Sequence, residues 1–164
     1  MLKNILDSIC NVLRVLLTCL TAVLTIPVTM QIIARYTGII PGYLWTEELA
    51  AFLFVWVVMI GSMVAVWDGT HFDVRVIPDA ERPLSRLLQD GLVHFLILVF
   101  GLTFAWYGLE YAKFGAIQNS MMMRANMLVT FVSVPIAGAF WAAFSGYHLY
   151  EDFVVYRTAR SALK

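Results

Sequence analysis

The chain has 164 residues, of which 61% are apolar or aromatic and 13% are charged. A soluble domain of average composition carries about twice this share of charged residues. The composition therefore excludes a disordered chain, a nucleic-acid-binding protein and an ordinary soluble enzyme, and it favours a membrane protein.

Four long runs without Asp, Glu, Lys or Arg predict four transmembrane helices. At a rise of about 1.5 Å per residue, each run is long enough to cross a hydrocarbon core of about 30 Å. The predicted spans are residues 15–33, 49–67, 92–109 and 127–149. We therefore predict an all-α fold, an integral membrane four-helix bundle that forms a single domain over residues 1–164.

The basic residues are distributed unevenly between the two sides of the predicted bundle. Eight of them lie in the N-terminal tail, the second loop and the C-terminal tail, whereas three lie on the other side. The three are Arg35, Lys113 and Arg124. Because Lys and Arg are enriched in cytoplasmic segments, we expect both termini to be cytoplasmic.

The first loop is the most distinctive polar segment. Arg35 follows the first span, and Glu47 and Glu48 precede the second. Both placements suit the helix dipoles, and the Thr46 hydroxyl can cap the second helix. An ion pair of Arg35 with Glu47 or Glu48 would join the first two helices near the outer interface, and the sequence leaves open whether this pair forms.

The second loop contains Pro78 and Pro83. After Pro83, Leu84, Leu87 and Leu88 recur at helical spacing among polar residues. This pattern predicts a short helix, which lies either in the membrane interface on the cytoplasmic side or as a cap over the bundle.

The third and fourth spans each contain one histidine, at His94 and His148. Either these side chains hydrogen-bond near the lipid headgroups, or the pair clamps a haem between two helices. Cys10 and Cys19 are separated by about 13.5 Å along a helix, too far for a disulfide. The sequence predicts no metal site and no cofactor.

Small residues recur every four positions in the fourth span, at Gly138, Ala142 and Gly146. Such faces let helix backbones approach closely in lipid. They pack either against other helices of this chain or against another subunit. Trp56 and Trp141 lie at mid-membrane depth, away from the interfaces that Trp prefers, and the same two interpretations apply to them.

No predicted span has an acidic residue in its middle. A carrier that couples an anion to protons or sodium uses intramembrane carboxylates or broken helices. Pro27 and Pro135 interrupt two spans, but a bend is the ordinary effect of a proline. The sequence therefore indicates that this chain does not move a charged solute alone.

Several short motifs follow one another along the chain. They are Arg35-Tyr36, Trp45 with Glu47-Glu48, Trp56 and Gly61, and Gly69 with His71 and Val74. In their order and depth, these motifs resemble the small membrane subunit of tripartite ATP-independent periplasmic (TRAP) transporters. The chain departs from that pattern at Asp68, where the family often has a basic residue. The resemblance extends over the whole chain.

The resemblance implies an accessory, non-enzymatic subunit in the cytoplasmic membrane of a bacterium or archaeon. Its expected partners are a large polytopic membrane subunit, which holds the substrate and sodium sites, a periplasmic solute-binding protein and membrane lipid. The expected substrates are organic acids such as C4-dicarboxylates. Two alternatives stay open at this point: a haem-binding membrane anchor of an oxidoreductase, and a small self-assembling transporter.

Overall fold

A computed structural model describes residues 2–38, 43–69 and 83–162. The regular structure in these ranges is helical and confirms the predicted all-α class. The elements are α1 (Leu2–Thr37), α2 (Leu44–Trp67), α3 (Pro83–Ile117), α4 (Leu128–Phe131) and α5 (Ser133–Ala162).

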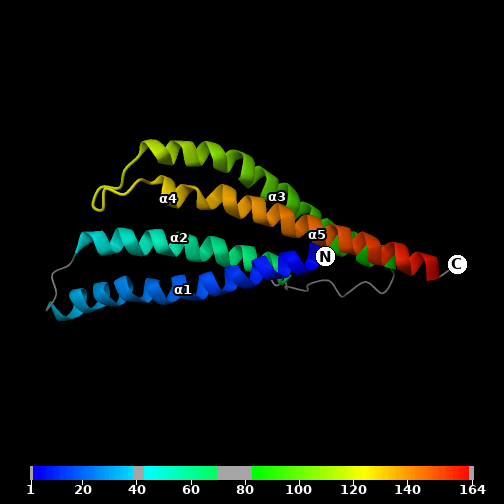
Figure 1. Cartoon of the computed structure of the whole chain (residues 1–164), viewed down its shortest axis with the longest axis horizontal. Coiled ribbons are helices and arrows are strands. Elements are labelled where there is room, and N and C mark those ends of the chain that lie inside the picture. Colours follow the sequence, from blue (N-terminus) through cyan, green and yellow to red (C-terminus); the bar gives the residue numbers. More distant parts are fainter. Residues whose placement is uncertain (1, 39–42, 70–82, 163–164) are drawn as a thin grey trace.

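The long helices form two hairpins that are joined through their inner members (Figure 1). α1 packs against α2, and α3 packs against α5. α2 also packs against α5, so the order across the molecule is α1, α2, α5, α3. We call the end where α1 begins and α5 ends the terminal end, and the opposite end, where α1 ends and α2 begins, the loop end.

The outward surface of the bundle is apolar. Large hydrophobic side chains such as Val15, Ile26 and Phe100 are more than half exposed. A soluble protein could not carry so many of them on its surface, whereas lipid is a suitable solvent for them. Four helical segments are long and apolar enough to cross a membrane. These segments are Lys3–Thr37, Leu44–Trp67, Leu88–Ile117 and Leu128–Thr158.

Glycines end the first two long helices. The Gly38 N–H donates to the Ala34 carbonyl at 3.3 Å, and the Gly69 N–H donates to the Val66 carbonyl at 3.4 Å. Both glycines have positive φ angles, +63° and +67°. Only glycine adopts this left-handed conformation without strain, so both positions act as helix stops.

The helix expected after Pro83 is not a separate element in the structure. Residues from Pro83 onward continue without a break into α3. Proline suits the first position of a helix because the N–H that it lacks would have no helical partner there. The loop residues before it, including His71, Val74 and Pro78, lie outside the described ranges.

The last predicted span is divided between α4 and α5, which are separated by Val132. Pro135 is the third residue of α5. It has no N–H to donate to the Phe131 carbonyl, four residues earlier, and its ring would clash with that carbonyl in a regular helix. The break occurs where α4 ends, at Phe131. Pro135 therefore accounts for the interruption.

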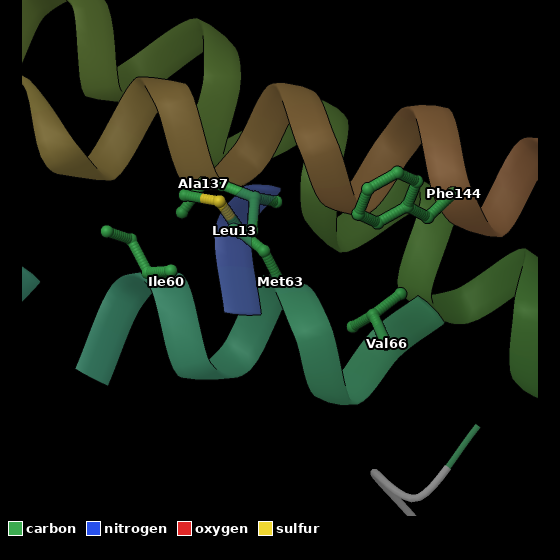
Figure 2. Close-up of a cluster of buried hydrophobic side chains, with 6 residues drawn as sticks. All are labelled: Leu13, Ile60, Met63, Val66, Ala137 and Phe144. Atoms are coloured by element: carbon green, nitrogen blue, oxygen red, sulfur yellow. The ribbon is translucent and has the colours of Figure 1, made fainter. Parts of the chain in front are cut away.

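A small apolar core joins the two hairpins (Figure 2). Its members from α1 and α2 lie in the halves of those helices nearer the terminal end. Its buried members are Leu13 from α1, Ile60, Met63 and Val66 from α2, and Ala137 and Phe144 from α5. Trp67 covers this core and contacts the Phe144 ring at 5.1 Å between centroids.

Candidate functional site

Glu48 makes the main polar contact between the two hairpins at the loop end. Its carboxylate accepts a hydrogen bond from the Ser120 hydroxyl and one from the Met123 N–H at 2.9 Å. It also accepts the Met122 N–H at 3.1 Å. These donors lie in the segment between α3 and α4, so Glu48 binds a turn that is 72 to 75 residues away in sequence.

No ion pair of Arg35 with Glu47 or Glu48 forms within the described part of the chain, which answers the question that the sequence left open. Glu48 is already occupied by donors fixed in the Ser120–Met123 turn. Arg35 lies in the last turn of α1, and Glu47 lies in the first turn of α2, where both suit the helix dipoles.

The prediction that the Thr46 hydroxyl caps α2 was wrong. The N-cap residue of α2 is Tyr43, and no side chain caps it. Thr46 is buried inside the first turn, and its hydroxyl donates to the Tyr43 carbonyl at 2.7 Å. Trp45 is exposed and contacts the Tyr43 ring, whereas Tyr36 at the end of α1 is 82% exposed.

Trp56 and Trp141 both contact other helices of this chain. The Trp56 indole N–H donates to the Val129 carbonyl of α4 at 2.9 Å. Trp141 lies on α5 and packs against Phe104 of α3, with ring centroids 5.3 Å apart.

The small-residue face of α5 is covered by α3. A Cβ placed on Gly138 would lie 2.4 Å from the Ala105 nitrogen, and one placed on Gly101 would lie 2.7 Å from the Ala142 nitrogen. A Cβ on Gly146 would lie 3.5 Å from Leu98. The backbones of the two helices are therefore in direct contact, and this face is filled within the chain. Gly61 has a similar but looser place, 3.8 Å from Leu17 of α1.

Asp68, the residue that departs from the TRAP pattern, pairs with Arg14 of α1. The neighbouring Trp67 indole N–H donates to Asp7 at 3.2 Å. Both contacts tie the terminal ends of α1 and α2 together. These pairs were not predictable from the sequence, because their members are 54 and 60 residues apart.

His94 and His148 lie together near the terminal end, on α3 and α5. Their rings are stacked, with centroids 5.2 Å apart and planes 20° apart. His94 Nδ1 contacts Asp152 at 2.7 Å, and His148 Nε2 lies 3.1 Å from the Trp67 carbonyl.

This geometry does not fit a haem clamp. Two axial histidines must approach the iron from opposite faces of a porphyrin that separates them, whereas these two rings are in direct contact. The described residues also contain no group of three or more His, Cys, Asp or Glu side chains arranged to hold a metal ion. The histidines instead connect α3, α5 and the end of α2.

Comparison with known proteins identifies the family. The DctQ component of tripartite ATP-independent periplasmic transporters matches residues 24–155. The Vibrio cholerae sialic acid TRAP transporter small permease protein SiaQ is 27% identical over 141 residues, which make up 85% of this chain and 79% of that protein.

Two further relatives match shorter regions. A Haemophilus influenzae protein, provisionally named a TRAP transporter small permease protein, is 24% identical over 99 residues, 60% of this chain and 61% of that protein. The Oleidesulfovibrio alaskensis isethionate TRAP transporter permease protein DctMQ is 23% identical over 117 residues, 67% of this chain and 18% of that protein. The chain thus spans less than two thirds of the length of these two relatives.

The family match extends over most of the chain and includes parts of all five helices. The apolar helices agree with this assignment to a multi-pass membrane protein. The chain belongs to the DctQ family, the small permease component of TRAP transporters.

Proposed function

We propose that this chain is an accessory subunit that packs on the fixed scaffold of a large membrane subunit and widens it. The complete transporter imports organic acids and is driven by sodium. Two relatives support this substrate class, because they are named for sialic acid and isethionate. Both compounds are organic acids that are anionic at neutral pH, as are C4-dicarboxylates.

The relative DctMQ supports the partnership with a larger permease component. The matched region makes up 18% of that permease protein, so most of its length lies outside the similarity. We infer that a large polytopic subunit performs the corresponding role as a separate partner of this chain.

The distribution of charged residues is the main observation that supports an accessory role. Glu48 lies near the loop end, and the His94–Asp152 pair lies near the terminal end. The predicted spans between them contain no Asp, Glu, Lys or Arg. Coupled transport of an anion requires a cation site and a substrate site at membrane depth. Both sites therefore belong to the large subunit.

The proposed orientation follows from the basic residues. With eight of the 11 Lys and Arg residues on the side of the termini, the terminal end faces the cytoplasm. The loop end then faces the periplasm, where a solute-binding protein delivers the organic acid. The chain resides in the cytoplasmic membrane and is surrounded by lipid on its apolar faces.

Reconstitution in liposomes tests this function. Vesicles that contain this chain, a sodium gradient and the solute-binding protein should take up no sialic acid, isethionate or C4-dicarboxylate. Uptake of one of these compounds should appear when the cognate large subunit is added, and it should stop when the sodium gradient is removed. Uptake by this chain alone would instead indicate a self-sufficient transporter.

A further inference from the structure

The turn formed by residues 120–123 gathers several hydrogen-bond donors around one carboxylate. We propose that this turn is a carboxylate-binding site whose resident ligand is Glu48, and that the pair is a latch between the loop ends of the two hairpins. The proposal concerns this chain alone and does not depend on the identity of the transported acid or of the large subunit.

The donors have the arrangement that an anion requires. The Ser120 hydroxyl and the Met123 N–H point to Glu48 Oε2, and the Met122 N–H lies 3.1 Å from Oε1. Successive backbone N–H groups in a tight turn form a concave site for anions. Hydrogen bonds to a charged acceptor are stronger than those to a neutral one, so the site favours a carboxylate over an amide.

The turn is held in shape by bonds that do not involve Glu48. The Ser120 N–H donates to the Ala125 carbonyl at 2.8 Å, and the Met127 N–H donates to the Gln118 carbonyl at 3.0 Å. The Asn126 amide donates to the Ala116 carbonyl at 3.0 Å. The donors should therefore keep their positions when Glu48 is replaced, and the vacated site should accept another small carboxylate.

The position of the contact makes it a latch. The core residues of α1 and α2 lie in the halves of those helices nearer the terminal end, and the ribbons of α2 and α5 diverge toward the loop end (Figure 1). Within the described ranges, Glu48 accepts every hydrogen bond that joins the first two turns of α2 to the segment between α3 and α4. Without it, the loop ends should separate while the core stays closed.

Glu47 provides a matched control. It precedes Glu48 in the same helical turn and carries the same charge, but its side chain is exposed and bonds to no described residue of the turn. Substitution of either glutamate changes the net charge and the interaction with the helix dipole in the same way. Only substitution of Glu48 removes the contact with the turn.

Distances between spin labels test the proposal. The full chain is placed in lipid nanodiscs, with the exposed Cys19 changed to Ser and the buried Cys10 left in place. Spin labels are attached to cysteines introduced at Tyr36 and Ile117, at the loop end. In a second sample, they are attached to cysteines introduced at Ser8 and Val155, near the terminal end. All four residues are exposed.

Glu48→Gln should lengthen and broaden the Tyr36–Ile117 distances and leave the Ser8–Val155 distances unchanged. Glu47→Gln should change neither pair. Unchanged Tyr36–Ile117 distances in Glu48→Gln, or the same change in Glu47→Gln, would overturn the latch.

Binding of a free carboxylate tests the chemistry of the site. In Glu48→Ala, added acetate should bind the vacated turn and shift the amide NMR signals of Met122 and Met123, whereas neutral acetamide or chloride at equal ionic strength should not. Equal effects of acetate and acetamide would overturn the carboxylate assignment. If the Glu48 variants fail to fold, Ser120→Ala removes one donor and should give an intermediate broadening of the spin-label distances at the loop end, and an unchanged distribution in this variant would overturn the proposal.

Discussion

Two glycines of α5 differ in how closely α3 approaches them. An added Cβ at Gly138 would meet backbone atoms of α3 at 2.4 and 2.7 Å, and backbone atoms cannot move aside without separating the helices. At Gly146 the nearest atom is the end of a flexible leucine side chain at 3.5 Å, which is ordinary van der Waals contact. The same methyl group should therefore have different effects at the two positions.

We expect Gly138→Ala to lower the free energy of unfolding by about 1–3 kcal/mol, as overpacking of a tight interface does. Gly146→Ala should change it by less than about 0.5 kcal/mol. Thermal or detergent-induced unfolding, followed by circular dichroism, measures both. Equal losses in the two variants would show that general crowding, and not backbone contact, determines the cost.

Sequence reasoning located these small residues but could not say what covers them. The four-residue spacing of Gly138, Ala142 and Gly146 is the same whether a helix of this chain or another subunit packs there. The partner of Glu48 was missed for a different reason. Backbone N–H groups are present at every residue except proline, so nothing in the sequence marks Met122 and Met123 as donors to a distant carboxylate.

The helices were predictable from hydropathy as elements, but their ends were not. α1 and α3 begin well before the apolar runs at residues 15–33 and 92–109. A polar turn in water can continue a helix as easily as it can end one, and only specific residues stop it. Gly38 and Gly69 are such stops, and Pro135 explains the break before α5.

The ion pair between α1 and α2 leads to a prediction about how these two helices are held together. Arg14 and Asp68 form an ion pair in which both side chains are partly exposed. Such pairs contribute about 0–1 kcal/mol. Arg14→Asp and Asp68→Arg should each lower the midpoint of unfolding, and the double exchange should recover part of the loss.

The Glu110–Lys113 pair of α3 is a control for this exchange. Both side chains are mostly exposed and lie on the same helix, so exchanging them should leave the midpoint almost unchanged. Strictly additive losses in the Arg14 and Asp68 double variant would indicate independent effects at two helix ends in place of a contact between helices.

For the whole molecule, the arrangement of the helices and the basic residues make one prediction about topology. α1 begins and α5 ends at the same end of the bundle, and the two tails and the second loop, which we expect on that side of the membrane, contain eight of the 11 basic residues. Reporter fusions after Lys164 and within residues 80–86 should be active in the cytoplasm. Fusions within residues 39–43 and 116–119 should be active in the periplasm, because the positive-inside bias fixes the orientation. A periplasmic signal from the fusion after Lys164 would contradict it.

The unequal lengths of α1 and α2 have a consequence for the surrounding bilayer. α1 has 36 residues and α2 has 24, which correspond to about 54 and 36 Å. Arg14 pairs with Asp68, the residue just past the end of α2. Most of the α1 turns before Arg14 therefore extend beyond the end of α2. There Lys3 lies 3.7 Å from Glu151 of α5. At the loop end, Glu47 and Glu48 lie near the start of α2, so little additional apolar helix is present there. A thicker or thinner membrane should therefore be accommodated mainly at the terminal end, where helix is available to enter or leave the lipid.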